Sequence, residues 1–398
     1  MSIRPGEDDS VLDTTLPVRQ AANQKPSTRD EFLSLLGKAI DQQVHDIFIE
    51  PGDKSGEVSF RTDGHLSTHK QITRERAQQY INLLADASSI PPHRLRQQPA
   101  TGKILIRHRG NQREARVAFI ETVFGVTADI RLSTRTPLTL DELGFEPEQL
   151  QAIKQTLASK QGLVVIAGPT TSGKSATGEA LLRYVEGTRK LKVFEIADVV
   201  EFQNPARSQI VVSKDITWRG ALGAALDFRA DVIYAGDVRT TEQAKMVADA
   251  ALRCPLVICT LHAKDAAQVI NRLQRMEVED YQLSAALILI IAQELRRKPC
   301  PKCRTNGGRQ MGQGCNACGG AGYSGLTLVS EVLPISTEIS TQLERHAGGD
   351  RIMKHATTKD GVLPMQEVER RKAAAGLIEP RPTATSDETG DTTAQPNA

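Results

Sequence analysis

The sequence predicts an α/β protein in three parts: a small α+β domain, a larger domain built on a mostly parallel sheet, and a short cysteine-rich module. Three observations predict this organisation. Short apolar runs alternate with helical patterns between residues 162 and 298, which is typical of a parallel sheet covered on both faces. A glycine-rich motif, Gly168-Pro-Thr-Thr-Ser-Gly-Lys-Ser175, stands where the first apolar run gives way to a helix. Two Cys-x-x-Cys pairs follow between residues 300 and 318.

Composition narrows the class of protein. The chain has 398 residues, enough for two or three domains, and a formal net charge of only +2. Such a small charge gives no overall attraction to nucleic acid or to an anionic membrane. The first thirty residues contain no apolar signal-peptide core, and four of the six cysteines are clustered. We therefore expect a cytoplasmic protein in a reducing compartment.

The most apolar stretch runs from Leu283 to Ala292. It is about half the length that a helix needs to span a bilayer. We expect a buried helix over residues 281–294, and any membrane contact of the chain is expected to be peripheral.

The first domain is expected to occupy residues 27–136. Residues 1–26 contain three prolines and lack periodicity, which favours a disordered leader. Thr28 and Glu31 then fit a capping box in front of an amphipathic helix. A second helix is predicted over residues 74–84, and a hairpin turn over residues 62–65. Strands are predicted at residues 44–49, 56–61, 103–108, 114–120 and 127–132.

Seven arginines and lysines crowd the interval from Arg94 to Arg116. Proteins that bind single-stranded nucleic acid combine such charges with aromatic side chains, but no Phe, Tyr or Trp occurs between Tyr80 and Phe119. Direct nucleic-acid binding is therefore not expected. A solvated strand face or an anion-facing surface is favoured.

The larger domain is expected at residues 162–298. A linker with a lead-in helix at residues 147–159 precedes it and fills the interval 137–161. Within the domain, strands are predicted at residues 163–167, 192–196, 209–213, 231–235 and 255–260, and helices at residues 176–185, 217–228, 241–253, 266–275 and 281–294.

The motif at Gly168 follows the phosphate-binding pattern of Gly, four residues, Gly-Lys-Ser/Thr. Its position between a strand and a helix is the context that the pattern requires, so a chance glycine-rich turn is a poor alternative. Lys174 is placed to neutralise the phosphates of ATP, and the Ser175 hydroxyl is placed to bind Mg²⁺. The residues expected to bind the nucleotide are Gly168, Pro169, Thr170, Thr171, Ser172, Gly173, Lys174, Ser175 and Ala176.

A phosphate-loop enzyme needs carboxylates where neighbouring strands end. Asp237 follows an apolar strand and is the best Mg²⁺ ligand beside Ser175; a turn-capping aspartate is the alternative. His262 ends the next strand, where it senses the γ-phosphate, bridges subunits or is structural. Spacing does not decide which of three further catalytic candidates faces the site: Glu195, Asp198 and Glu201.

The two Cys-x-x-Cys pairs are separated by eleven residues and flanked by glycines that allow tight turns. Four thiolates at this spacing suit a tetrahedral, structural Zn²⁺ site; an iron–sulfur cluster or a redox pair is the alternative. The expected zinc ligands are Cys300, Cys303, Cys315 and Cys318, in a module at residues 299–333. Cys254 and Cys259 flank an apolar strand and are expected in the core.

The remaining chain divides into a helical segment and a tail. Helices are predicted within residues 334–378. Residues 379–398 contain three prolines and no core-forming residues, which predicts a disordered tail.

The order of these motifs resembles that of the hexameric ATPases of type II secretion and type IV pilus systems, especially their pilus-assembly branch. Residues 45–51 and 61–66 are similar to the family's amino-terminal domain, residues 196–201 to its aspartate box, residues 235–239 to its Walker B segment, and residues 260–266 to its histidine box. The resemblance implies a RecA-like P-loop core, a PAS-like amino-terminal domain and a tetracysteine zinc module. It also implies catalytic roles for Arg116, Arg131 and Arg239.

The resemblance further implies a homohexamer that hydrolyses ATP and drives pilin-like subunits through an inner-membrane platform protein. The chain itself is then peripheral, held by its partners at the cytoplasmic face of that membrane. Ala197 stands where the family usually has a water-activating Glu, and Thr171 stands where Gly is usual. Loss of that Glu slows phosphoryl transfer, so a weakly hydrolysing structural or regulatory subunit is the second hypothesis. A DNA-dependent motor is a lesser third.

Overall fold

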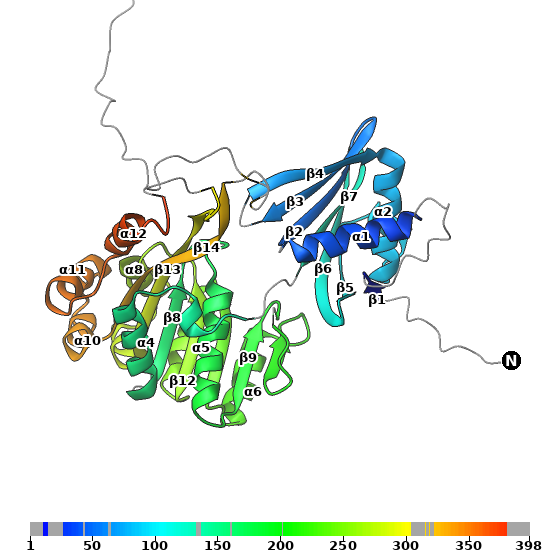
Figure 1. Ribbon diagram of the computed structural model, residues 1–398. Helices are drawn as coiled ribbons and strands as arrows, with labels where there is room; N and C mark the ends of the chain where they lie inside the picture. Colours follow the sequence, from blue (N-terminus) through cyan, green and yellow to red (C-terminus); the bar gives the residue numbers. More distant parts are fainter. Residues whose placement is uncertain are drawn as a thin grey trace, which may run out of the picture. The chain divides into compact units, whose positions relative to one another are not determined.

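The computed structural model describes residues 11–14, 27–42, 44–62, 65–132, 137–159, 161–200, 202–303, 315, 318 and 322–379. The chain divides into two compact units, Met1–Leu138 and Thr139–Ala398, and each is described by itself. Unit 1 is drawn in blue to cyan and unit 2 mainly in green to red (Figure 1).

Unit 1 is a seven-stranded sheet with two long helices on one face. Its strand order is β1-β5-β6-β7-β2-β3-β4, and only β1 and β5 pair in parallel. Phe32 of α1 and Tyr80 of α2 share one core with alternate strand residues such as Val117 and Ile130. The elements are β1 Val11–Asp13, α1 Thr28–Asp41, β2 Asp46–Pro51, β3 Ser55–Thr62, β4 His65–Thr73, α2 Arg74–Ala87, α3 Pro92–Leu95, β5 Ala100–His108, β6 Asn111–Thr122 and β7 Gly125–Leu132.

Two expectations for unit 1 need correction. The prediction of a disordered leader over residues 1–26 is wrong for β1, which pairs with β5 and buries Leu12. The capping box of α1 lies one residue earlier than expected, because the Ser27 side chain accepts from the Asp30 amide and the Asp30 carboxylate accepts from the Ser27 amide. Apart from residues 11–14, the leader lies outside the described residues.

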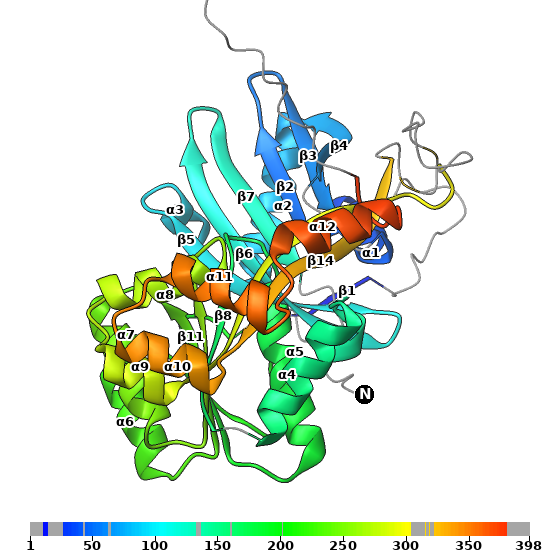
Figure 2. The same ribbon diagram turned by 90° about the vertical axis from the view of Figure 1, so that its left-hand side faces the viewer.

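Unit 2 is built on a second seven-stranded sheet, of order β10-β9-β11-β12-β8-β13-β14. All neighbours pair in parallel except β13 and β14. Figure 2 shows α4 and α5 on one side of this sheet and α7 to α10 on the other. The elements are η1 Leu140–Glu142, α4 Pro147–Ser159, β8 Gly162–Ala167, α5 Lys174–Thr188, β9 Val193–Ala197, β10 Ser208–Val211, α6 Trp218–Asp227, β11 Val232–Val238, α7 Thr241–Ala251, β12 Leu256–Leu261, α8 Ala266–Arg275, α9 Asp280–Ala286, β13 Leu287–Pro299, β14 Tyr323–Pro334, α10 Thr337–Glu344, α11 Gly349–Lys359 and α12 Met365–Ala374.

The prediction of a helix over residues 281–294 is wrong after Ala286. Residues 287–299 form β13, which pairs with β8 on one side and β14 on the other. Its first seven residues are all buried, and an unbroken apolar run suits a two-sided buried strand as well as a buried helix. The change of element extends the sheet by two strands and carries the chain to the cysteine cluster.

Within unit 2, helix α12 makes buried polar contacts with two distant segments of the chain. The Lys372 ammonium of α12 is buried and donates to the carbonyl oxygens of Gly144 and Leu328. Burial lowers the pKa of this lysine. Because Lys372 Nζ also lies 3.9 Å from Oε1 of Glu146, residues 144–146, which lead into α4, are held by α12. The tail predicted for residues 379–398 lies outside the described residues except for Glu379.

Candidate functional site

The phosphate-binding motif forms the turn from β8 to α5, as expected. Thr171 and Gly173 have φ angles of 66° and 84°, a left-handed conformation that glycine adopts without strain. Gly173 is the N-cap of α5, and no side chain caps the helix there. The first-turn amides of a helix lack intrahelical acceptors and carry partial positive charge. This uncapped helix start fits the phosphates of a nucleotide.

The Lys174 side chain lies along the same loop. Its Nζ donates to the carbonyl oxygens of Gly168 and Pro169, at 2.9 Å each. Burial lowers the pKa of Lys174, and the negative charge of Asp237 opposes that shift. The lysine therefore lies within the electrostatic reach of the carboxylate that the sequence predicts for Mg²⁺.

The Asp237 carboxylate contacts side chains at the ends of two neighbouring strands, β11 and β12. Its Oδ2 lies 3.0 Å from Nε of Arg239 and 3.4 Å from Nε2 of His262, and its Oδ1 accepts from the Thr260 hydroxyl at 3.3 Å. The hydrogen bond to Asp237 raises the pKa of Arg239. Asp237, Arg239 and His262, three predicted catalytic residues, thus form one cluster where β11 and β12 end.

Asp198 and Ala197 adjoin this cluster from β9. The Asp198 carboxylate lies 3.4 Å from Nη1 of Arg239 and is about half exposed. Ala197 is buried, and its Cβ lies 3.3 Å from the position that a side chain on Gly236 would take. A glutamate at position 197 would therefore start beside the residue that precedes Asp237.

The structure does not bring Glu195 into this cluster. Its carboxylate is buried, accepts from Gln209 Nε2 at 2.5 Å and lies 3.9 Å from Nη1 of Arg207. The Arg207 guanidinium is fully buried and also bonds Glu179 and Glu186 of α5. Burial opposes its charge, but the hydrogen bonds to both glutamates prevail and raise the pKa of Arg207. The remaining candidate, Glu201, lies outside the described residues.

The four clustered cysteines converge at the end of the β13–β14 hairpin. Their sulfur atoms all lie within 4.8 Å of one another, with separations of 3.5 to 3.9 Å for three of the pairs. A tetrahedron with metal–sulfur bonds of about 2.3 Å has edges of about 3.8 Å. Amides of Cys315 and Gly322 donate to Cys318 Sγ at 3.2 and 3.3 Å, as is usual around a ligating thiolate. The donor set fits one zinc ion.

The other two cysteines are core residues, as predicted. Cys254 and Cys259 are both buried in unit 2. Burial raises the pKa of the Cys259 thiol to about 12, so this thiol stays protonated.

Most of the chain also matches one protein family. The family described as Type II/IV secretion system protein matches residues 21–381. The chain belongs to this family.

Proteins similar in sequence to this chain include components of both pilus and secretion systems. The chain is 31% identical over 369 residues to the type IV pilus assembly ATPase PilB of Thermus thermophilus, an alignment that covers 86% of this chain and 41% of that protein. It is 31% identical over 351 residues to the type II secretion system protein HxcR of Pseudomonas aeruginosa, covering 86% and 74%. It is 32% identical over 364 residues to the protein transport protein HofB homolog of Escherichia coli, covering 86% and 77%. The chain thus spans less than half of the Thermus relative and about three quarters of the other two.

Two solved structures, of the ATPase DotB and of the pilus retraction motor PilT, share the fold. The ATPase DotB of Legionella pneumophila matches with a TM-score of 0.71 and 18% identity, over 93% of this chain and 96% of that chain. The pilus retraction motor PilT, solved with bound ADP, matches with a TM-score of 0.62 and 23% identity, over 87% and 93%. At these identities the likeness concerns the fold alone. The fold class predicted from the sequence is confirmed.

Two further predicted catalytic residues, Arg116 and Arg131, belong to unit 1. They are opposite each other in the register of β6 and β7. Nε of Arg131 donates to Oδ1 of Asp46 at 2.9 Å, and the same carboxylate lies 3.5 Å from Nη1 of Arg61. The two predicted arginines are therefore neighbours, on a sheet face that also carries a buried carboxylate.

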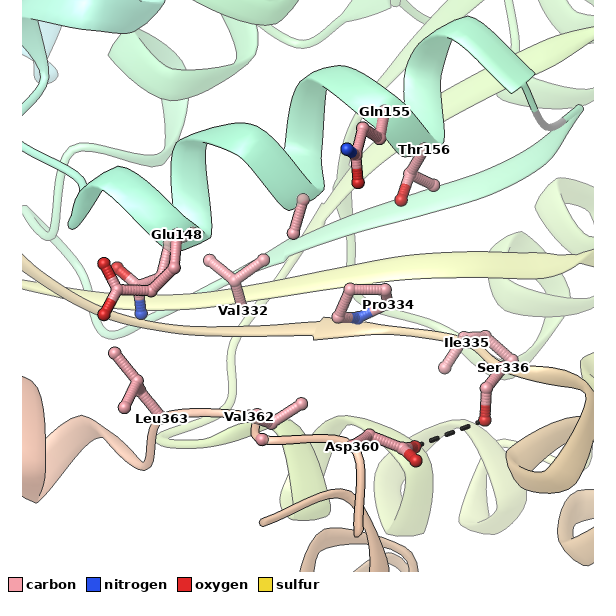
Figure 3. A pocket seen from close by; sticks show the side chains of 13 residues that line it. Glu148, Gln155, Thr156, Val332, Pro334, Ile335, Ser336, Asp360, Val362 and Leu363 are labelled. Atoms are coloured by element: carbon pink, nitrogen blue, oxygen red, sulfur yellow. Dashed lines mark hydrogen bonds between the residues drawn. The ribbon is translucent and has the colours of Figure 1, made fainter.

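A pocket of about 450 Å³ lies elsewhere in unit 2, between α4, β14 and residues 360–363 (Figure 3). Val332, Pro334 and Leu363 provide apolar walls, and Asp360 accepts from the Ser336 hydroxyl at 3.3 Å. The residues that line this pocket do not include the phosphate loop or the Asp237 cluster. Among the described residues, no helix combines the length and apolar character that crossing a membrane requires.

The sequence patterns did not predict that a side chain of β13 contacts the phosphate loop. Gln293 of β13 bonds both the loop and α5. The available signal was a single amide directly after the apolar run that ends at Ala292.

Proposed function

We propose that this chain is the ATP-hydrolysing subunit of a homohexameric motor for type IV pilus assembly or type II-like secretion. In this proposal it works at the cytoplasmic face of the inner membrane, docked on a membrane platform protein, and moves pilin-like subunits. Family membership and the names of the relatives support the machinery. The cluster at the ends of β8, β11 and β12 supports the chemistry.

The observation that carries the proposal is that the phosphate loop and Asp237 lie at one edge of the sheet, where the carboxyl ends of β8, β12 and β11 adjoin. The amide of Gly168, in the loop, donates to the Leu261 carbonyl of β12 at 3.3 Å, and His262, the next residue, contacts Asp237.

Lys174 and the first amides of α5 would hold the phosphates, and Ser175 with Asp237 would hold Mg²⁺. The metal ion would neutralise charge on the β- and γ-phosphates. Arg239 and His262 fix the Asp237 carboxylate through its Oδ2, so it does not have to be oriented at the moment of reaction.

We further propose that Cys300, Cys303, Cys315 and Cys318 hold a structural zinc ion. The sulfur separations support this assignment, and so do the amide donors around Cys318. Four protein ligands leave no open position, so the ion would order the end of the β13–β14 hairpin and take no part in hydrolysis.

One observation favours a second candidate, an ATP-binding subunit that hydrolyses slowly. Ala197 stands at the end of β9 beside Gly236, and Glu195 is engaged by Gln209 and Arg207. Among the described residues, Asp198, which directly follows β9, is then the remaining candidate carboxylate next to the cluster.

Steady-state ATP hydrolysis by the zinc-replete protein separates the two candidates. Lys174→Ala is the control, and particle size is measured with and without ATP. Turnover that is lost in the variant and occurs in a hexamer-sized particle supports the motor. Tight ATP binding and ring assembly without turnover would support the second candidate instead.

A further inference from the structure

Gln293 is a fully buried amide beneath the phosphate loop. Its exposed fraction is 0%, although glutamine is mostly found at protein surfaces. The preceding residue, Ala292, pairs with Ala167, the last residue of β8. Gln293 is therefore level with the point where β8 gives way to the loop.

Both polar atoms of the Gln293 side chain are engaged. Nε2 donates to the carbonyl oxygen of Ser172 at 2.8 Å, and Oε1 accepts from the Thr177 hydroxyl at 2.8 Å. Ser172 belongs to the loop, whereas Thr177 lies in the first turn of α5. One side chain on β13 thus ties the loop to the helix that follows it.

The loop backbone also packs directly on β13. A Cβ at Gly168 would lie 2.4 Å from the carbonyl oxygen of Gln293. A Cβ at Gly173 would lie 3.2 Å from Leu295 Cδ1 and 3.4 Å from Gln293 Nε2. Close approach to the backbone of this strand therefore requires glycine at position 168. At position 173 a Cβ would only crowd side chains of the strand, and the φ angle of 84° is the stronger reason for glycine.

The bond to Ser172 also orients the next amide. In a trans peptide the C=O and N–H groups point in opposite directions. Because Gln293 holds the Ser172 carbonyl toward β13, the amide of Gly173 points away from the strand. That amide belongs to the helix start at which an anion is expected.

We propose that Gln293 is a positioning residue for phosphate binding. It acts through the Ser172–Gly173 peptide and Thr177 and does not itself contact the nucleotide. The inference rests on the proposed ATP site and adds to it a residue more than a hundred positions away in the sequence.

The test compares Gln293→Leu with Gln149→Leu in the full-length protein. Gln149 is a matched control because it is 4% exposed and both polar atoms of its side chain are engaged. Its Nε2 donates to the Ser330 carbonyl at 2.9 Å, and its Oε1 accepts from the Ser330 hydroxyl at 2.9 Å and from the Glu146 amide at 3.2 Å. Each variant is measured for ATP affinity, for KM and kcat, and for amide hydrogen exchange over residues 168–177 without nucleotide.

Gln293→Leu leaves a buried carbonyl and a buried hydroxyl without partners, so ATP affinity is expected to fall roughly tenfold or more. KM should rise more than kcat falls, and exchange over residues 168–177 should speed up. Gln149→Leu should lower thermal stability by a similar amount and leave affinity and exchange at wild-type levels.

Equal affinity in wild type and Gln293→Leu would overturn the inference, as would equal losses in both variants. If Gln293→Leu does not fold, Thr177→Val removes the second bond alone and must raise exchange over the same residues for the inference to stand. Failure of the wild-type protein to bind ATP would instead overturn the proposed function.

Discussion

Asp237 Oδ2 lies 3.4 Å from Nε2 of His262, a contact that joins the ends of β11 and β12. The same oxygen lies 3.0 Å from Nε of Arg239. The carboxylate is therefore held from two sides, and its charge acts on Lys174. This arrangement leads to predictions about each member of the site.

Asp237→Asn is expected to reduce ATP turnover by about a hundredfold or more, because it removes the charge proposed to hold Mg²⁺. Nucleotide affinity measured in EDTA should change little. Steady-state hydrolysis and nucleotide titration check both statements. Asp227→Asn changes an exposed aspartate at the end of α6, serves as the control and should behave as wild type. Full turnover in Asp237→Asn would contradict the assignment.

Ala197→Glu is expected to raise turnover by about tenfold or more, since it places a carboxylate beside Gly236 in the cluster. Ala197→Gln has nearly the same size without the charge and should give no gain. Initial rates at saturating ATP and Mg²⁺ provide the comparison. Equal rates in both variants would mean that a different carboxylate, such as Asp198, already activates water.

Arg131→Ala is expected to lower turnover by about tenfold to a thousandfold, because it removes a cation that we propose is catalytic and stabilises charge on the transferred phosphate. Arg109→Ala removes an arginine of the same unit, paired with Asp41 at its surface, and should leave turnover unchanged. If both variants hydrolyse ATP like wild type, Arg131 has no catalytic role.

Asp129→Asn is expected to stabilise unit 1 by about 1 kcal/mol at pH 7. Burial, and then the Asp46 charge, raises the pKa of Asp129 above 3.8, and its buried Oδ1 has no hydrogen-bond partner among the described residues. A carboxyl whose pKa is higher in the folded state destabilises the fold once pH rises past that pKa.

The stability that unit 1 gains from Asp129→Asn should therefore decrease as pH falls from 7 toward 4. Hydrogen exchange of unit 1 amides, measured between these pH values, reports that stability. Asp53→Asn, an exposed change in the same unit, should give no gain at either pH. A gain that does not depend on pH would contradict the electrostatic origin.

Cys318→Ser is expected to lower bound zinc from about one ion per chain to near zero, because structural zinc needs all four thiolates. Metal content after gel filtration measures this. Cys254→Ser alters a buried cysteine outside the cluster, whose Sγ donates to the Ala230 carbonyl, and should retain the metal. Iron in the purified protein would contradict the zinc assignment.

The sequence was sufficient for the phosphate loop and for the strand ends that carry Asp237 and His262. A buried strand, a glycine-rich turn and an amphipathic helix are local patterns, and parallel strands bring their carboxyl ends to one edge. The four cysteines were predictable for the same reason, since their spacing alone limits how they close on an ion.

Local patterns failed where two elements satisfy the same pattern. Every residue from Leu287 to Ile291 is apolar, so periodicity does not separate a helix from a buried strand. The segment forms a strand because it pairs with β8 and β14. Likewise, a short apolar segment in a polar leader became β1 because the edge of β5 was available to it.

The sequence by itself thus determined which residues are the candidates for the chemistry: the loop, its lysine, the strand-end carboxylate and the clustered cysteines. Only the tertiary structure decided that Glu195 is engaged by Gln209 and Arg207, whereas Asp198 pairs with Arg239, the arginine that also contacts Asp237. Only the tertiary structure placed Gln293 under the loop. Burial and hydrogen-bond partners come from segments distant in the chain, so spacing cannot specify them.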